Sequence, residues 1–76
     1  MYSWGRKMGE TLADALPKRM KEIREVFIPA YQAIGPTGSF AIAMMQFELS
    51  EAERALASQD VARMMSAYQA LMDFKL

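Results

Sequence analysis

Residues 40–72 read FAIAMMQFELSEAERALASQDVARMMSAYQALM, and this stretch decides the fold. Its first part repeats apolar side chains at steps of three and four, the spacing of one face of a helix. A second apolar set of the same period follows, and only the short polar segment Ser58-Gln59-Asp60 separates the two. Asp60 is a favourable N-cap, and so short a turn makes neighbouring helices antiparallel. We therefore predict a helical hairpin over about residues 39–57 and 60–74. The two apolar sets are Ile42, Met45, Leu49, Ala52 and Leu56, then Val61, Met64, Met65, Tyr68, Leu71 and Met72.

The residues before the hairpin also carry a helical pattern, which the segment Gly35-Pro36-Thr37-Gly38-Ser39 ends. Glycine suits the left-handed position after a helix, and proline cannot continue one. We predict a helical region over about residues 8–34, after a loosely ordered tail at residues 1–7. Pro29 is expected to kink this region. Pro17 either kinks one long helix or lies in the first turn of a second helix capped by Asp14. The apolar positions are Met8, Leu12, Leu16, Met20, Ile23, Phe27, Ala30 and Ile34.

No segment alternates apolar and polar residues with a period of two, so we predict no strand. The expected fold is all-α: one small domain with an N-terminal kinked or split helix packed on a C-terminal antiparallel hairpin. Residues 40–47 are apolar on every side except at Gln46. Such a helix has to be covered all round, which is difficult within a single domain of this size. We therefore expect a homodimer, with Phe40, Met44 and Phe47 at or near its interface.

The composition excludes most catalytic chemistry. The 76 residues include no cysteine and no histidine, so disulfides, thiolate ligands and the commonest general base are absent. Glu48, Glu51 and Glu53 lie off the apolar seam, and paired catalytic carboxylates need a cleft. We predict no enzymatic activity, no catalytic residue, no cofactor and no metal. The longest apolar run is far shorter than the ~20 residues of a membrane span, and the lack of cysteine fits the cytoplasm. We expect a cytoplasmic protein with no membrane span.

Protein–protein interaction is the function that these features favour most, with a small regulatory or inhibitory role. Eight methionines are present, and methionine suits both adaptable recognition surfaces and small cores. Both interpretations remain open for Met44, Met45, Met64 and Met65. The partner is another protein, or a second copy of the chain. The predicted contact residues are Phe40, Met44, Phe47, Met64 and Tyr68.

Two other functions follow from different features. The basic residues Lys18, Arg19, Lys21 and Arg24 could face an anionic partner such as nucleic acid. Against this, nine basic and nine acidic residues cancel, and glutamates interleaved with the basic residues are typical of a salt-bridged helix face. The remaining alternative is a structural or assembly component that forms large homo-oligomers.

Residues 47–65, FELSEAERALASQDVARMM, carry a resemblance to known proteins. They resemble the short helical hairpins of small phage and prophage proteins of unassigned function, and the likeness extends over about residues 36–75. The resemblance implies a small accessory protein that acts on a host or virion component. It transfers no catalytic residue.

Overall fold

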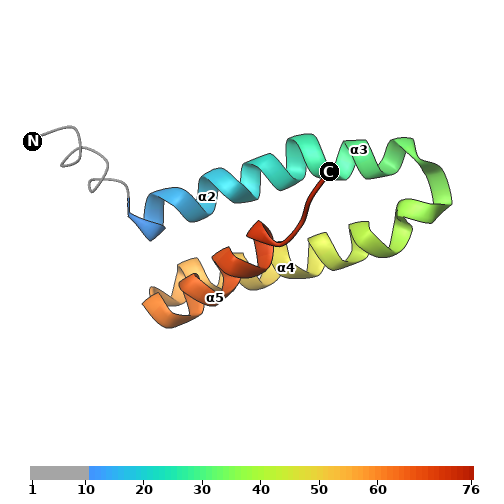
Figure 1. The fold of residues 1–76 in the computed structure, drawn as a ribbon. Coiled ribbons are helices and arrows are strands. Elements are labelled where there is room, and N and C mark those ends of the chain that lie inside the picture. The colour runs from blue at the N-terminus through green and yellow to red at the C-terminus, as the bar shows by residue number, and fades with distance from the viewer. Residues whose placement is uncertain (1–10) are drawn as a thin grey trace, which may run out of the picture.

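The computed structural model describes residues 11–76, and every regular element in this part of the chain is a helix (Figure 1). This confirms the all-α class. The predicted tail at residues 1–7 and the apolar position Met8 lie outside the described residues. The elements are α2 (Leu12–Glu22), the π-helix η1 (Ile23–Phe27), α3 (Ile28–Ala33), the 3₁₀-helix η2 (Gly35–Gly38), α4 (Ser39–Ser58) and α5 (Val61–Met72).

Helix α2 begins after Thr11 and continues through Pro17. The backbone N–H and the hydroxyl of Thr11 both donate to the Asp14 carboxylate, at 3.4 Å and 3.2 Å. Asp14 therefore supports the cap at Thr11, and it caps no second helix. Of the two alternatives for Pro17, the structure has the continuous helix.

The helix also continues through Pro29, and η1 immediately precedes this residue. In a regular α-helix the proline ring collides with the carbonyl four residues earlier, here that of Glu25. A π-turn is wider, and such turns are a known way to absorb an irregularity in a helix. The N–H of Ile28 bonds to the carbonyl of Ile23, five residues back. We attribute the π-turn to Pro29, because it leaves more space between the ring and the preceding turn.

The segment GPTGS ends the helical run and turns the chain back. Gly35 has a φ of 78°, the left-handed conformation that favours glycine. Gly38 is buried, and a Cβ at this position would collide with the carbonyl group of Tyr31. The start of α4 can therefore pack closely on α3.

Helices α4 and α5 occupy the residues where the hairpin was predicted. Gln59 turns the chain with a φ of 58°. The Asp60 carboxylate then accepts hydrogen bonds from the backbone N–H groups of Ala62 and Arg63, at 3.0 Å and 3.4 Å. This is the N-cap that the sequence predicted for the second arm.

The three long helices lie side by side, with α2 and α5 running in one direction and α4 in the other (Figure 1). Because α5 is much shorter than α4, we distinguish two ends of the molecule. The three-helix end consists of α2, α5 and residues 49–58 of α4. The two-helix end consists of α3, η2 and residues 39–48 of α4, and residues 73–76 continue from α5 towards α3 (Figure 1). The buried apolar residues are Leu16, Met20, Ile23, Phe27, Met45, Leu49, Ala52, Ala55, Met64, Ala67 and Leu71.

Candidate interaction surface

Three large apolar side chains of α4 are exposed to solvent. Phe40 is 77% exposed, Met44 40% and Phe47 57%. Steps of four and three place them on one side of the helix, which we call the α4 stripe. Met45 and Leu49, on another side of α4, are buried in the core. The apolar segment 40–47 is therefore covered on one side and open on another.

The outer part of the two-helix end is also apolar and exposed. Ile34 and Leu76 are both exposed, and with Ala30 and Tyr31 they line an open cavity of about 410 Å³. The Tyr31 hydroxyl donates a hydrogen bond to the carbonyl of Lys75, which holds the C-terminal residues against α3. The end of the chain thus covers part of α3 and leaves the α4 stripe open.

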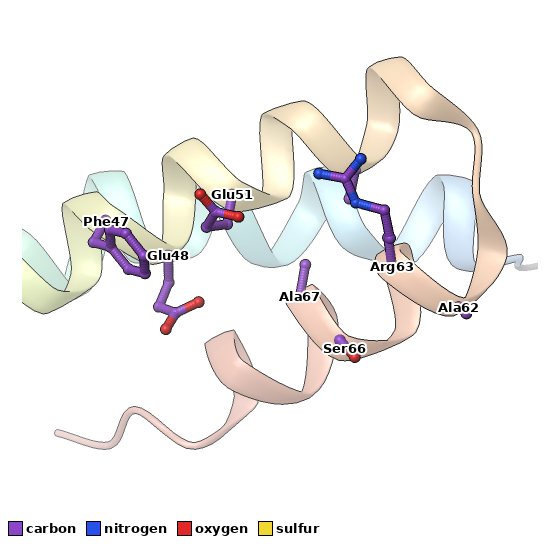
Figure 2. A pocket seen from close by; sticks show the side chains of 8 residues that line it. Phe47, Glu48, Glu51, Ala62, Arg63, Ser66 and Ala67 are labelled. Atoms are coloured by element: carbon purple, nitrogen blue, oxygen red, sulfur yellow. The ribbon is translucent and has the colours of Figure 1, made fainter.

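A groove of about 450 Å³ runs between α4 and α5, beginning at Phe47 (Figure 2). Glu48 and Glu51 line it on α4, and Arg63 lines it on α5. Glu51 is paired with Arg54 at 3.0 Å. Within residues 11–76, Glu48 and Arg63 have no side-chain hydrogen bond or ion pair. The remaining lining residues are small: Ala55, Ala62, Ser66 and Ala67.

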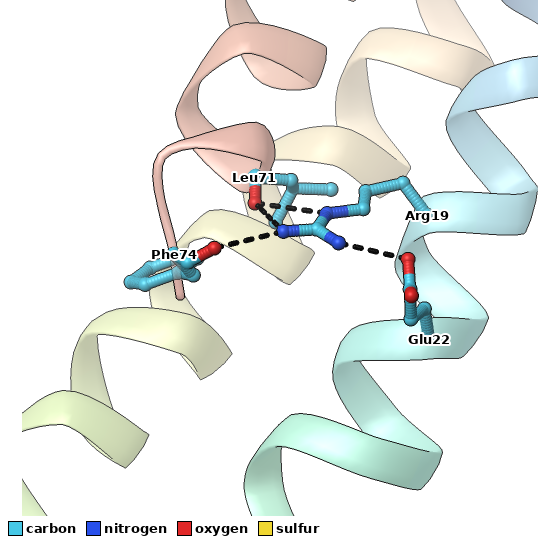
Figure 3. A network of polar contacts seen from close by, with 4 residues as sticks. All are labelled: Arg19, Glu22, Leu71 and Phe74. Atoms are coloured by element: carbon cyan, nitrogen blue, oxygen red, sulfur yellow. Dashed lines mark hydrogen bonds and ion pairs between the residues drawn. The ribbon is translucent and has the colours of Figure 1, made fainter. Parts of the chain in front are cut away.

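Arg19, one of the four basic residues considered for an anionic partner, donates hydrogen bonds to backbone carbonyls within the fold (Figure 3). Its Nε and Nη2 donate to the carbonyl of Leu71 at 3.0 Å and 2.9 Å, and Nη2 also donates to that of Phe74 at 2.9 Å. Nη1 binds Glu22 at 2.8 Å, and the guanidinium lies 4.6 Å from the centre of the Phe27 ring. The carbonyls at the end of a helix have no partner within the helix, and a cation is favourable there. Arg19 therefore fastens the end of α5 to α2.

The other predicted basic residues lie apart from this network. Arg24 forms an ion pair with Glu53, which connects η1 with α4. Lys18 and Lys21 are exposed on α2. Arg19 and Arg24 are thus engaged in contacts between elements of the fold.

The structure divides the methionines between the core and the surface. Met45 and Met64 are buried, whereas Met44 and Met65 are exposed. Met64 is only 6% exposed and lies in the core with Ala67 and Leu71, so the predicted contact role has no accessible surface there. Tyr68 is half-buried and packs against the core. Neighbouring residues on a helix point about 100° apart, which explains why each methionine pair is divided.

Three residues of the predicted apolar set on α5 are exposed, so this set does not form a single core face. Val61, Met65 and Met72 are exposed, and Ala67 takes a place in the core. The signal was present in the sequence: Met64, Ala67 and Leu71 share one face at steps of three and four. The predicted apolar set contained only large residues of α5, so it did not include Ala67.

Within residues 11–76, no group of three or more acidic side chains could hold a metal ion, and no helix is both long and apolar enough to cross a membrane. Comparisons with protein families, curated proteins and solved structures gave no match. The candidate site consists of exposed apolar side chains on α4, beside a groove with an acidic and a basic end.

Proposed function

We propose that this protein is a non-enzymatic protein–protein interaction module and that the α4 stripe is the centre of its contact surface. The observation that carries the proposal is the exposure of Phe40, Met44 and Phe47 in one row on a helix whose other side fills the core. Contiguous apolar surface of this kind is characteristic of interaction sites. Two aromatic side chains in the row fit this use, because aromatic residues are enriched at the energetic centres of interfaces.

The proposed binding mode is the packing of a helix on the α4 stripe. The spacing of four and then three is that of the apolar anchors through which helices recognise helices or grooves. Met44 lies between the two phenylalanines, and its flexible thioether can adapt to the shape of a partner. A protein that acts only by occupying such a surface fits a small regulatory or inhibitory role.

The first partner that we propose is a second copy of the chain. At the two-helix end the α4 stripe is exposed within the described residues. A helix from another copy can supply the missing cover. Below about 70–80 residues, self-association is one of the common ways to supplement a small core.

The test removes the α4 stripe and compares it with a matched change elsewhere. One variant carries Phe40→Ser, Met44→Ser and Phe47→Ser; the control carries Val61→Ser, Met65→Ser and Met72→Ser on α5. Light scattering at tens of micromolar should give a mass above one chain for the wild type and the control, and the mass of one chain for the stripe variant.

A wild-type mass of one chain would rule out the homodimer. The interaction module would then depend on a foreign protein, captured from lysate by the wild type and the control and lost by the stripe variant. If both variants bound that protein as well as the wild type, the α4 stripe would not be the contact surface.

A further inference from the structure

The groove between α4 and α5 carries opposite charges at its two ends. Glu48 lies with Phe47 at one end, Arg63 lies near the α4–α5 turn at the other, and Ala67 lies between them (Figure 2). Glu48 and Arg63 therefore lie at opposite ends of the groove (Figure 2). No ion pair joins them within the described residues.

This arrangement is complementary to itself. A two-fold axis through the middle of the groove reverses its direction, so that the acidic end of one copy meets the basic end of the other. Glu48 then faces Arg63 of the second copy, and the same contact is repeated on the other side of the axis. Glu51 lies nearest to the axis, where it would approach its equivalent. Its ion pair with Arg54, at 3.0 Å, reduces the repulsion between the two carboxylates.

The shape of the groove is complementary in the same sense. Phe47 projects at the acidic end and is 57% exposed. The basic end is lined by the small side chains of Ala55, Ala62 and Ser66, which leave space above them. The two-fold axis that pairs the charges also brings Phe47 of one copy over the small residues of the other. A large side chain in a pocket of this kind is the usual centre of an interface.

We propose that the α4–α5 groove binds a second copy of the same chain in an antiparallel, two-fold symmetric dimer. In this dimer Glu48 of each copy pairs with Arg63 of the other, and Phe47 of each copy lies over the exposed Ala62 and Ser66 of the other. The inference rests on the proposed function and adds the occupant and the geometry. Charge and shape are matched by the same axis, which favours a second copy over an unrelated helix.

The test uses the symmetry of the proposed contact. Glu48→Arg alone sets arginine against arginine at both contacts, and Arg63→Glu alone sets glutamate against glutamate. We expect the dimer Kd of each single variant to rise by about tenfold or more, because like charges across an interface are strongly unfavourable. In an equimolar mixture of the two variants, both contacts become Arg–Glu. The mixture should therefore form a heterodimer with about the wild-type Kd.

The controls make the same charge changes outside the groove. Glu25→Arg on η1 and Lys21→Glu on α2 alter exposed residues. Their dimer Kd should stay within about twofold of the wild type, as expected for exposed charges that lie away from a contact. Native mass spectrometry of one isotopically labelled and one unlabelled variant counts homodimers and heterodimers directly. Circular dichroism verifies that each variant is folded.

Three results would overturn the inference: a monomeric wild type, unchanged dimerisation of both charge variants, or a mixture that forms no heterodimer. If the charge variants dimerise normally while the serine variant of the α4 stripe does not, the interaction module stands and the groove geometry is wrong. If neither set of changes affects self-association, the proposed contact surface fails as well.

Discussion

The two ends of the molecule are built from the same helix α4, yet they differ in how well the chain covers them. At the three-helix end, Leu16 and Leu71 are completely buried. At the two-helix end, Met45 is buried as well, but α3 has no buried residue, and Phe40 is the most exposed large apolar side chain in residues 11–76. The difference follows from length, because α4 has 20 residues and α5 has 12.

Apolar side chains and the packing that covers them are distributed unequally along α4. Residues 40–47 form the most apolar part of α4, but several of their large side chains remain exposed in the described part of the chain. Residues 49–58 contain more charged side chains and are packed from two sides. Stability should therefore depend mainly on the three-helix end, whereas the α4 stripe at the two-helix end is exposed and available for binding.

The largest effect is expected for Leu71→Ala at the three-helix end. Leu71 is 0% exposed, and loss of a fully buried leucine side chain leaves a cavity. The free energy of unfolding should fall by about 2–5 kcal/mol, a large part of the stability of a small domain. Urea denaturation followed by circular dichroism measures it. The matched control is Leu76→Ala at the exposed C-terminus, which should change the unfolding free energy by less than about 0.5 kcal/mol. Equal losses for both variants would remove the distinction between the ends.

A second prediction concerns the hydrogen bonds between Arg19 of α2 and the carbonyls at the end of α5. Arg19→Met keeps the apolar stem but removes every hydrogen bond to the carbonyls of Leu71 and Phe74. The unfolding free energy should fall by about 1.5–3 kcal/mol, the range for hydrogen bonds made by charged groups. Arg19→Lys keeps the charge without the planar donor fork, so it should recover only part of this loss. Hydrogen exchange at residues 71–74 should accelerate in both variants, and unchanged protection there would contradict the assigned role.

The sequence predicted the hairpin well because its signals are local. Helical spacing, the turn at Ser58-Gln59 and the Asp60 cap all lie within a few residues of the structure that they specify. The role of Arg19 is different, since its acceptors lie 52 and 55 residues away in the chain. The interleaved charges predicted a salt-bridged helix face, but no local pattern indicated that Arg19 would also bind the end of α5.

The candidate site was predictable only in part. The all-round apolar character of residues 40–47 indicated the α4 stripe, and Phe40, Met44 and Phe47 are indeed exposed. The division of each methionine pair follows the helical pattern, because Met45 shares a face with Leu49 and Met64 shares one with Ala67 and Leu71. The pairing of an acidic and a basic end in one groove depends on the alignment of α4 with α5, so it became visible only in the structure.

A third prediction tests the close contact between Gly38, directly before α4, and Tyr31 of α3. Gly38→Ala places a Cβ against the carbonyl group of Tyr31, so one of the two segments has to move. We expect a loss of about 1–3 kcal/mol in unfolding free energy, as for other overpacked sites. In the comparison variant, Gly35→Ala, the Cβ meets nothing within 4 Å, and only the positive φ is unfavourable. Its loss should be about 1–2 kcal/mol. Thermal denaturation of both variants measures the two losses of stability. A greater loss for Gly35→Ala would mean that the backbone conformation of this turn matters more than the close contact between Gly38 and Tyr31.

The smallest effect on stability is expected at Phe40, the most exposed large apolar residue of the two-helix end. Phe40→Ser should change the unfolding free energy of the single chain by less than about 0.5 kcal/mol, because the ring is open to solvent and the two residues have similar helix propensities. The measurement is a fluorescence-detected urea titration at a concentration below that of self-association. Phe27→Ser, which removes a buried ring, is the matched comparison and should destabilise the chain by several kcal/mol. If Phe40→Ser destabilised the single chain as strongly as Phe27→Ser, Phe40 would support the fold. If its only effect were weaker self-association at higher concentration, the stability of this end would depend on the second copy.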